Sequence, residues 1–289
     1  MATKPGLSCV ATQRKKRWRK AMSTTEALLA RLNAVFDSAR PAALAVSGGV
    51  DSMTLAFVSH LRLGAGVTMF HAASAAVPVS ATERVRDYAA RHGWDLRIID
   101  AGEFADERYL ANPSNRCFFC KSNLYGALSS LSQAQLFSGT NTDDLCDWRP
   151  GLKAADANSV RHPFVEAGMS KADVRALAAA HGLTNLAELP SAPCLSSRVE
   201  TSLRIEPQTL RAIDQVETLL RGELSPETVR CRVRRAGIVV ELDQPTLSCL
   251  SEDSRARLSH QICAAFGGPR PVHFQAYVRG SAFLREQSA

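Results

Sequence analysis

Short apolar runs alternate with amphipathic segments along most of the chain from Ala42 onward. Apolar runs bounded by turn residues are typical of strands buried on both faces, and apolar residues every three or four positions are typical of helices that pack on such strands. The pattern predicts an α/β fold, a mostly parallel sheet with helices on both faces. We expect strands at 43–46, 67–72, 95–99 and 135–139, and helices at 52–63, 80–92, 121–131 and 171–181.

The pattern changes after Pro190, where a stretch containing Ser and Pro leads to Arg198. An amphipathic segment at 207–221 predicts a helix, and alternating residues from 229 to 242, broken at Ala236-Gly237, predict a hairpin. We therefore place a domain boundary near Val199. Residues 23–198 are expected to form the α/β domain, and residues 199–289 a small α+β domain for substrate binding or oligomerisation.

The net charge of +7 does not belong to the folded part of the chain. Residues 1–22 hold basic side chains and no acid, and the rest of the chain sums to zero, so nucleic acid is not expected as a partner. No apolar core follows the basic stretch as in a secretory signal, and no run approaches the ~20 residues that span a bilayer. We expect a cytoplasmic protein without membrane contact, whose tail 1–22 is disordered or precedes a start at Met22.

The amino-acid composition narrows the class of protein further. Hydrophobic residues at 45% and charged residues at 22% exclude a mainly disordered chain and a collagen-like repeat. In a cytoplasmic chain of this size, the 8 cysteines are not expected to form a disulfide framework. Their positions are therefore more informative than their number.

A glycine loop, Ser47-Gly48-Gly49-Val50-Asp51-Ser52, directly follows a predicted strand and opens a predicted helix. Glycines let the backbone turn sharply and present its N–H groups, and a helix N-terminus adds partial positive charge, so the loop suits a polyphosphate. It is neither a Walker loop nor the Gly-x-Gly-x-x-Gly of dinucleotide-binding folds. The alternative is an ordinary glycine-rich turn without a ligand.

At these residues the sequence resembles the N-type PP-loop ATP pyrophosphatases, in which a substrate oxygen attacks the α-phosphate of ATP and pyrophosphate leaves. The resemblance implies that residues 23–198 are a PP-loop domain and that Asp51 holds Mg²⁺. It also implies an ATP site made by Ser47, Gly48, Gly49, Asp51 and Ser52.

Three cysteines stand out: Cys117-x-x-Cys120 and Cys194, which begins Cys194-Leu-Ser-Ser-Arg198. Thiolates suit iron and zinc, and three of them leave one metal position open for chemistry. The residues alone leave four interpretations: an iron–sulfur cluster, a zinc ion with an unidentified fourth ligand, a disulfide between Cys117 and Cys120, or a lone reactive Cys194. Arg198 would favour the Cys194 thiolate.

Several segments together resemble one PP-loop family, LarE, the ATP-dependent sulfur-insertion enzymes of nickel-pincer cofactor synthesis. The resemblance implies a sulfur transferase that adenylates a carboxylate of a pyridinium dicarboxylate mononucleotide and inserts sulfur to give a thiocarboxylate. The segments are 115–121, 139–144, 149–152, 170–175 and 194–198.

The sulfur source differs within that family. Some members surrender the sulfur of the cysteine that matches Cys194, whereas members with three cysteines hold a 4Fe-4S cluster. The resemblance thus implies a 4Fe-4S cluster on Cys117, Cys120 and Cys194, which are also the expected catalytic residues. It further implies a sulfur or iron–sulfur donor protein as partner, and a homo-oligomer.

A row of arginines alternates along the predicted hairpin at Arg230, Arg232 and Arg234. In an extended strand they share one face, and guanidinium groups bind phosphate oxygens in pairs. The alternative is a solvated basic face paired with acids. The LarE resemblance implies a substrate-phosphate site of Arg230, Arg232, Ser197, Arg198 and Glu241.

The sequence departs from the family at Ser138, where Asp is usual, and at Thr201-Ser202, where an aromatic-Gly pair is usual. A related carboxylate is therefore an alternative acceptor. Amidation, thiolation of a transfer RNA, and a non-catalytic iron–sulfur or metal carrier are the alternative functions.

Overall fold

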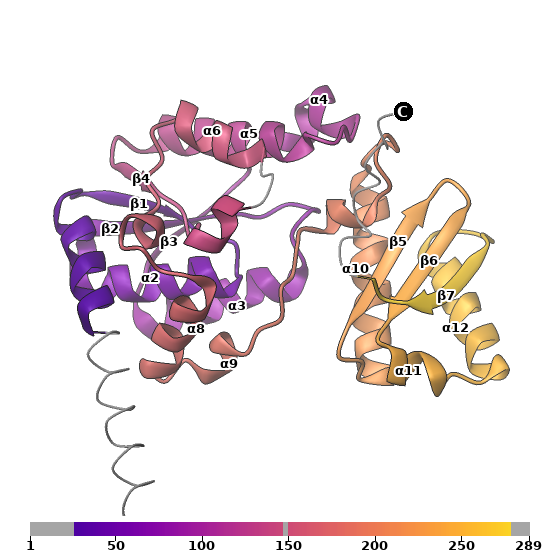
Figure 1. The fold of residues 1–289 in the computed structure, drawn as a ribbon. Coiled ribbons are helices and arrows are strands. Elements are labelled where there is room, and N and C mark those ends of the chain that lie inside the picture. Colours follow the sequence, from indigo (N-terminus) through magenta and orange to yellow (C-terminus); the bar gives the residue numbers. More distant parts are fainter. Residues whose placement is uncertain (1–25, 147–149, 279–289) are drawn as a thin grey trace, which may run out of the picture.

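Two separate sheets organise the chain in the computed structural model, which describes residues 26–146 and 150–278 (Figure 1). The first sheet is parallel and has the strand order β3-β2-β1-β4. Its strands are β1 (Ala42–Ala45), β2 (Val67–Ala72), β3 (Asp95–Ile99) and β4 (Gln135–Phe137). The predicted parallel sheet is confirmed. Strand β4 stops before Gly139, because the chain turns there toward the glycine loop.

Helices cover both faces of this sheet, as the pattern predicted (Figure 1). Alternate residues of β1 point to opposite cores: Ala42 and Leu44 to one, Ala43 and Ala45 to the other. The first core is covered by a helix over residues 26–37, α2 (Val50–Leu63), α3 (Val79–His92) and α8 (Lys171–Ala180). The second is covered by α5 (Arg116–Leu131) and α6 (Pro150–Ala157).

Helix α5 begins earlier than the pattern predicted, at Arg116 rather than Lys121. Leu124 and Leu128 form the apolar face of α5 from which the helix was predicted, and both are buried. The first turn of α5 does not continue this apolar periodicity, so the sequence pattern did not include it. Cys117 and Cys120 therefore lie inside the helix and not before it.

The second sheet contains the predicted hairpin and one further strand. Strands β5 (Val229–Arg234) and β6 (Gly237–Leu242) are antiparallel, and β7 (Val272–Ala276) pairs with β6 in parallel. Helices α10 (Pro207–Leu224), α11 (Gln244–Ser248) and α12 (Glu252–Ala265) accompany them. The hairpin and α10 confirm their predictions. The sequence pattern did not identify β7 or α12.

Single-turn elements fill the connections. In chain order they are η1 (Gly64–Gly66), η2 (Glu103–Ala105), α4 (Glu107–Leu110), η3 (Thr142–Cys146), α7 (Pro163–Glu166), α9 (Thr184–Ala187) and η4 (Leu195–Arg198).

A packed seam joins the two parts of the molecule. Ala76, in the loop after β2, and Tyr109 and Leu110, in α4, come from the first part, yet they belong to the core under the second sheet. Backbone bonds follow the same seam: the Leu195 amide donates to the Ala76 carbonyl at 2.9 Å, and the Ile205 amide donates to the Leu110 carbonyl at 2.9 Å. The domain boundary near Val199 stays a prediction, and it lies within this seam.

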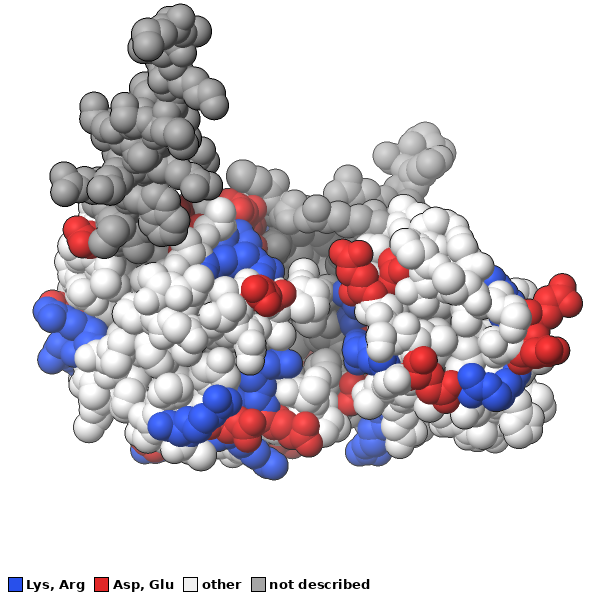
Figure 2. All heavy atoms as spheres, turned by 90° about the horizontal axis from the view of Figure 1, so that it is seen from below, with Lys and Arg blue, Asp and Glu red and all other residues white. Residues whose placement is uncertain are grey.

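In residues 26–146 and 150–278, the helices are all too short or too polar to cross a bilayer. The tail 1–22 lies outside the described residues. Figure 2 shows basic and acidic side chains intermixed on one face, without a continuous basic patch.

Candidate active site at the carboxyl edge of the parallel sheet

The glycine loop connects the end of β1 to the N-terminus of α2, as the sequence predicts. Its two serines close it, because the Ser47 amide donates to Ser52 Oγ at 3.0 Å. Gly48 has φ +81°, and a Cβ there would lie 2.7 Å from the Ala81 carbonyl oxygen. Arg84 of α3 donates to the Gly48 carbonyl at 2.7 Å. The loop is therefore held tightly, with α2 starting directly behind it.

Asp51, in the first turn of α2, contacts two residues that sequence reasoning did not assign. Its carboxylate accepts from Lys171 Nζ and, at 3.2 Å, from Asn141 Nδ2. A Cβ on Gly139 would lie 2.7 Å from the Ser52 amide nitrogen, so only glycine lets the two backbones approach this closely. Lys171 and Asn141 are remote from Asp51 along the chain, and only the fold brings them to it.

The two cysteines of α5 lie at the same edge of the sheet as the glycine loop. Strand β3 ends at the carboxyl edge, and η2, α4 and the first turn of α5 follow it before the helix returns toward β4. Cys117 and Cys120 are three residues apart in this first turn, so they share a helix face. Cys194 reaches this edge by another path, because its neighbour Leu195 is bonded to the loop after β2.

The three thiols interact electrostatically around Lys121. Burial is the main reason that the pKa of Cys120 is raised to about 12; Cys194, Glu103 and Cys117 add to this rise, and Lys121 opposes it. For Lys121, burial lowers the pKa, but Tyr125 and all three thiols outweigh burial and leave it raised. None of the three cysteines forms a disulfide, and Cys194 is exposed.

The donor set formed by these thiols is chemically suited to an iron–sulfur cluster, which is bound through thiolates. In the described part of the chain, no three His, Cys, Asp or Glu side chains are placed to hold a single metal ion. A 4Fe-4S cluster places its ligands on different irons, and so needs them farther apart than one ion does. Three free thiols around Lys121 fit the larger group on these grounds.

Arg198 is buried beneath the Cys194 loop, where it makes contacts within the protein. Its Nε and Nη2 donate to Glu217 at 2.9 and 3.1 Å. Its Nη1 donates to the carbonyls of Pro193 at 2.6 Å and Cys194 at 3.2 Å. Ser197 Oγ donates to the same Cys194 carbonyl at 2.8 Å. Both residues fix the backbone that carries Cys194.

The arginines of β5 have different partners. Arg232 Nε lies 2.8 Å from Glu241, both side chains are buried, and Arg234 lies 3.6 Å from the same carboxylate. Arg230 donates to the Ser191 carbonyl at 2.9 Å. Burial lowers the pKa of Arg230. The structure thus brings Ser197 and Arg198 to the Cys194 backbone and pairs Arg232 with Glu241, while their phosphate role stays a prediction.

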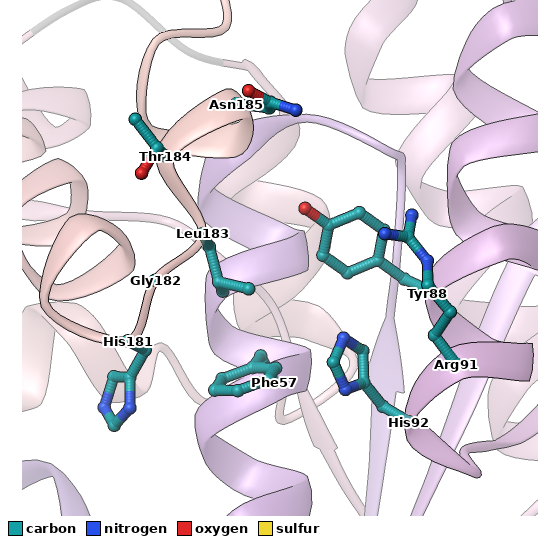
Figure 3. Close-up of a pocket in the computed structure, with 9 residues that line it drawn as sticks. All are labelled: Phe57, Tyr88, Arg91, His92, His181, Gly182, Leu183, Thr184 and Asn185. Atoms are coloured by element: carbon teal, nitrogen blue, oxygen red, sulfur yellow. The ribbon is translucent and has the colours of Figure 1, made fainter.

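Of two surface pockets, one lies at the carboxyl edge of the parallel sheet and the other lies away from the predicted site residues. One of about 490 Å³ lies at the carboxyl edge, between the loop after β2, the end of β3 and α10, with Ser74, Asp100 and Arg211 in its wall. Another of about 460 Å³ lies around Phe57, between α2, α3 and the end of α8 (Figure 3). The second pocket includes His92 and His181 and contains none of the predicted site residues.

Comparison with known proteins gives three relatives, and no protein-family model matches the chain. An uncharacterised protein of Synechocystis sp. is 34% identical over 235 residues, which cover 79% of this chain and 86% of the relative. An uncharacterised protein of Methanocaldococcus jannaschii is 24% identical over 213 residues, 72% of this chain and 80% of the relative. The pyridinium-3,5-bisthiocarboxylic acid mononucleotide synthase of Lactiplantibacillus plantarum is 27% identical over 228 residues, 77% of this chain and 82% of the relative.

Proposed function

The chain belongs to one family with its Synechocystis relative, and because it is also similar to the Lactiplantibacillus plantarum synthase, we propose that it is an ATP-dependent sulfur transferase of the LarE type. The acceptor is a carboxylate of a pyridinium dicarboxylate mononucleotide, in keeping with the name of that synthase. The observation that carries the proposal is that the glycine loop and the helix with Cys117 and Cys120 lie at one edge of a parallel sheet, where the segment after Cys194 is also bonded.

The first step of the proposed reaction is adenylation. A carboxylate oxygen of the substrate attacks the α-phosphorus of ATP, a new P–O bond forms, and pyrophosphate leaves. The glycine loop and the N-terminus of α2 would hold the leaving pyrophosphate through backbone N–H groups. Lys171 and Mg²⁺ on Asp51 would neutralise its charge, and since these cations compete for Asp51, Lys171 would turn toward the phosphates when Mg²⁺ binds.

The second step is sulfur transfer. A sulfur nucleophile attacks the acyl carbon, and AMP leaves with the electron pair of the broken C–O bond. A 4Fe-4S cluster, held by Cys117, Cys120 and Cys194, would supply sulfide for this step when it is bound. Arg198 and Ser197 hold the backbone of Cys194, and Lys121 balances the negative charge of the thiolates.

The proposal is tested by measuring pyrophosphate and thiocarboxylate separately, without oxygen, from Mg-ATP and the dicarboxylate mononucleotide. Wild type is expected to form both products. Asp51→Asn should lose both, whereas Cys194→Ala should still release pyrophosphate and form no thiocarboxylate. Iron and sulfide analysis of wild type and of a variant lacking all three cysteines tests the cluster.

Two alternative functions and one alternative sulfur source have their own results in this experiment. Absence of pyrophosphate release in wild type would favour a carrier without catalysis. Product formation that needs ammonia and survives Cys194→Ala would favour amidation. A colourless wild type that forms thiocarboxylate once per chain would leave Cys194 itself as the sulfur donor.

A further inference from the structure

A buried carboxylate oxygen without a partner lies beside the cysteines. Glu103 is only 4% exposed, and its Oε2 atom has no hydrogen-bond partner within the described residues. A buried carboxylate oxygen is costly unless a donor or a cation satisfies it, so such an atom in a folded protein calls for an explanation. No residue of the described chain supplies that partner.

The position of Glu103 is set by η2, the turn that follows β3. This turn packs against both α4 and α5. The adjacent Asp106 accepts from Asn123 Nδ2 of α5 at 2.9 Å, which fixes the segment on the helix that carries the cysteines. Phe104, next to Glu103, and Cys120 both pack against the same apolar core. Glu103 is thus held at the carboxyl edge, on the side of α5 where Cys120 lies.

Electrostatic interactions connect Glu103 with the thiols. Besides burial, Glu103 and Cys194 are among the groups that raise the pKa of Cys120. The same two groups, again besides burial, raise the pKa of Tyr109, whose hydroxyl lies 2.6 Å from Ser196 Oγ, two residues after Cys194. Glu103 and Cys120 therefore lie on two elements that pack against each other, η2 and α5, and the charges of Glu103 and Cys194 both act on Cys120 and Tyr109. Thiols and a buried carboxylate oxygen without a partner are both metal-ligating groups, which favours a bound metal centre.

We propose that Glu103 is a fourth protein ligand, whose Oε2 binds the metal position that Cys117, Cys120 and Cys194 leave without a thiolate. This inference rests on the proposed iron–sulfur cluster and adds to it a residue of this chain. A carboxylate oxygen is a hard ligand and suits this iron less well than sulfur does. With the cluster bound, incoming hydrosulfide would displace it: one Fe–O bond would break and one Fe–S bond would form, the carboxylate would keep its electron pair, and no electron would be transferred.

Such a displaceable ligand has a clear consequence for the protein. The iron without a thiolate is the one that oxidation removes most readily. Glu103 retains this iron while sulfide is absent. When the site is loaded, hydrosulfide replaces Glu103 as the ligand of the iron. Replacement of the carboxylate by an amide of the same shape removes the anionic ligand and leaves the three thiolates in place.

The test loads wild type, Glu103→Gln and the control Glu107→Gln with ferrous iron and sulfide in the absence of oxygen. Glu107 is the matched control, because it lies on the adjacent α4 but is 75% exposed and paired with Arg204. Excess sulfide is then removed and ferricyanide is added stepwise. Iron per chain and the electron paramagnetic resonance signal of the three-iron form are measured.

All three proteins are expected to take up about four irons. Glu103→Gln should then lose one iron roughly tenfold faster than wild type and Glu107→Gln. Tenfold is the lower end of the loss in metal affinity that substitutions around a metal site usually cause. Excess sulfide should abolish the difference, because hydrosulfide then occupies the position. Glu103→Asp, which keeps a shorter carboxylate, should be intermediate, and it replaces Glu103→Gln if that variant does not fold.

Equal loss of iron from wild type and the Glu103 variants would overturn the assignment of Glu103 and leave the cluster intact. A wild type that takes up no iron would instead reject the cluster, and with it this inference. Circular dichroism and the melting temperature of each variant separate loss of a ligand from loss of folding.

Discussion

Gly48 and Gly139 show at the residue scale how the glycine loop obtains its shape. Gly48 has φ +81°, a conformation that side chains disfavour, and it also approaches Ala81 closely. Gly139 lies against the backbone of Asp51 and Ser52. Both glycines are therefore required by contacts between elements: a side chain at Gly48 would collide with Ala81 of α3, and one at Gly139 with the first turn of α2.

We predict that Gly48→Ala lowers stability and abolishes ATP binding. The positive φ alone costs about 1–2 kcal/mol for a residue with a Cβ, and the contact with Ala81 adds to it. Gly126→Ala is the control, because a Cβ there, in the middle of α5, meets nothing within 4 Å. Alanine should stabilise that helix by up to about 1 kcal/mol. Urea denaturation and calorimetric titration with Mg-ATP measure both effects, and equal behaviour of the two variants would contradict the prediction.

At the scale of elements, α10 and β5 support the Cys194 loop through a buried network. Glu217 of α10 binds Arg198 with both oxygens, accepts from Arg221 at 2.7 Å and accepts from the Cys231 amide of β5 at 3.1 Å. Arg198 in turn donates to the Cys194 carbonyl. A helix and a strand of the second part thus determine where a cysteine at the edge of the first part lies.

We predict that Glu217→Gln destabilises the protein by about 3–5 kcal/mol, since it leaves the buried Arg198 without its counter-charge. Glu223→Gln on the same helix is the control. Its carboxylate has a partly exposed pair with Arg257 at 2.7 Å, so we expect a loss below about 1 kcal/mol. Chemical denaturation measures both variants, and a similar small loss in each would contradict a supporting role for Glu217.

The buried pair of Glu217 and Arg198 also predicts that the stability of the protein depends on pH. Burial alone would raise the pKa of Glu217, but Arg198, the Cys231 amide and Arg221 outweigh it and leave the pKa below its ordinary 4.5. The stabilisation is therefore fully present above pH 4.5 and is lost as the pH falls through the lower pKa of the folded state. The stability difference between wild type and Glu217→Gln should shrink over this acidic range.

At the scale of the whole molecule, the candidate site lies where two parts of the chain share a core. Tyr109 and Leu110 enter the core under the second sheet, and Tyr109 is bonded to Ser196 in the Cys194 loop. The thiols of α5 belong to the first part, and Cys194 lies on the segment that leads from the first part into the second. Their convergence therefore depends on the packing between the two parts as well as on either sheet.

We predict that the two parts of the described chain unfold together, and that Leu110→Ala lowers the temperature of this single unfolding transition. Leu110 is 7% exposed, and its truncation should cost about 2–5 kcal/mol. Leu131→Ala, at a position 51% exposed on α5, is the control and should change stability little. Differential scanning calorimetry checks this. Two separate transitions, of which Leu110→Ala shifts only one, would show that the seam does not couple the parts.

The sequence by itself determined the elements whose cause is local. Buried parallel strands, the amphipathic helices on them and the hairpin at 229–242 follow from hydrophobic periodicity and turn residues, and the structure confirms them. The glycine loop was found in the same way, since its glycines lie between a strand and a helix. Strand β7 was missed although apolar and polar residues alternate along it, because it has only 5 residues and none of them is fully buried.

Only the tertiary structure decided which side chains meet. Lys171 and Asn141 reach Asp51, and Arg198 is directed to Glu217 and not outward, because strand order and helix packing bring distant segments together. The unpaired oxygen of Glu103 is likewise visible only once its surroundings are known. Hydrophobic periodicity indicates which face of each helix or strand is buried. It does not indicate which other element packs against that face, because this depends on the tertiary fold.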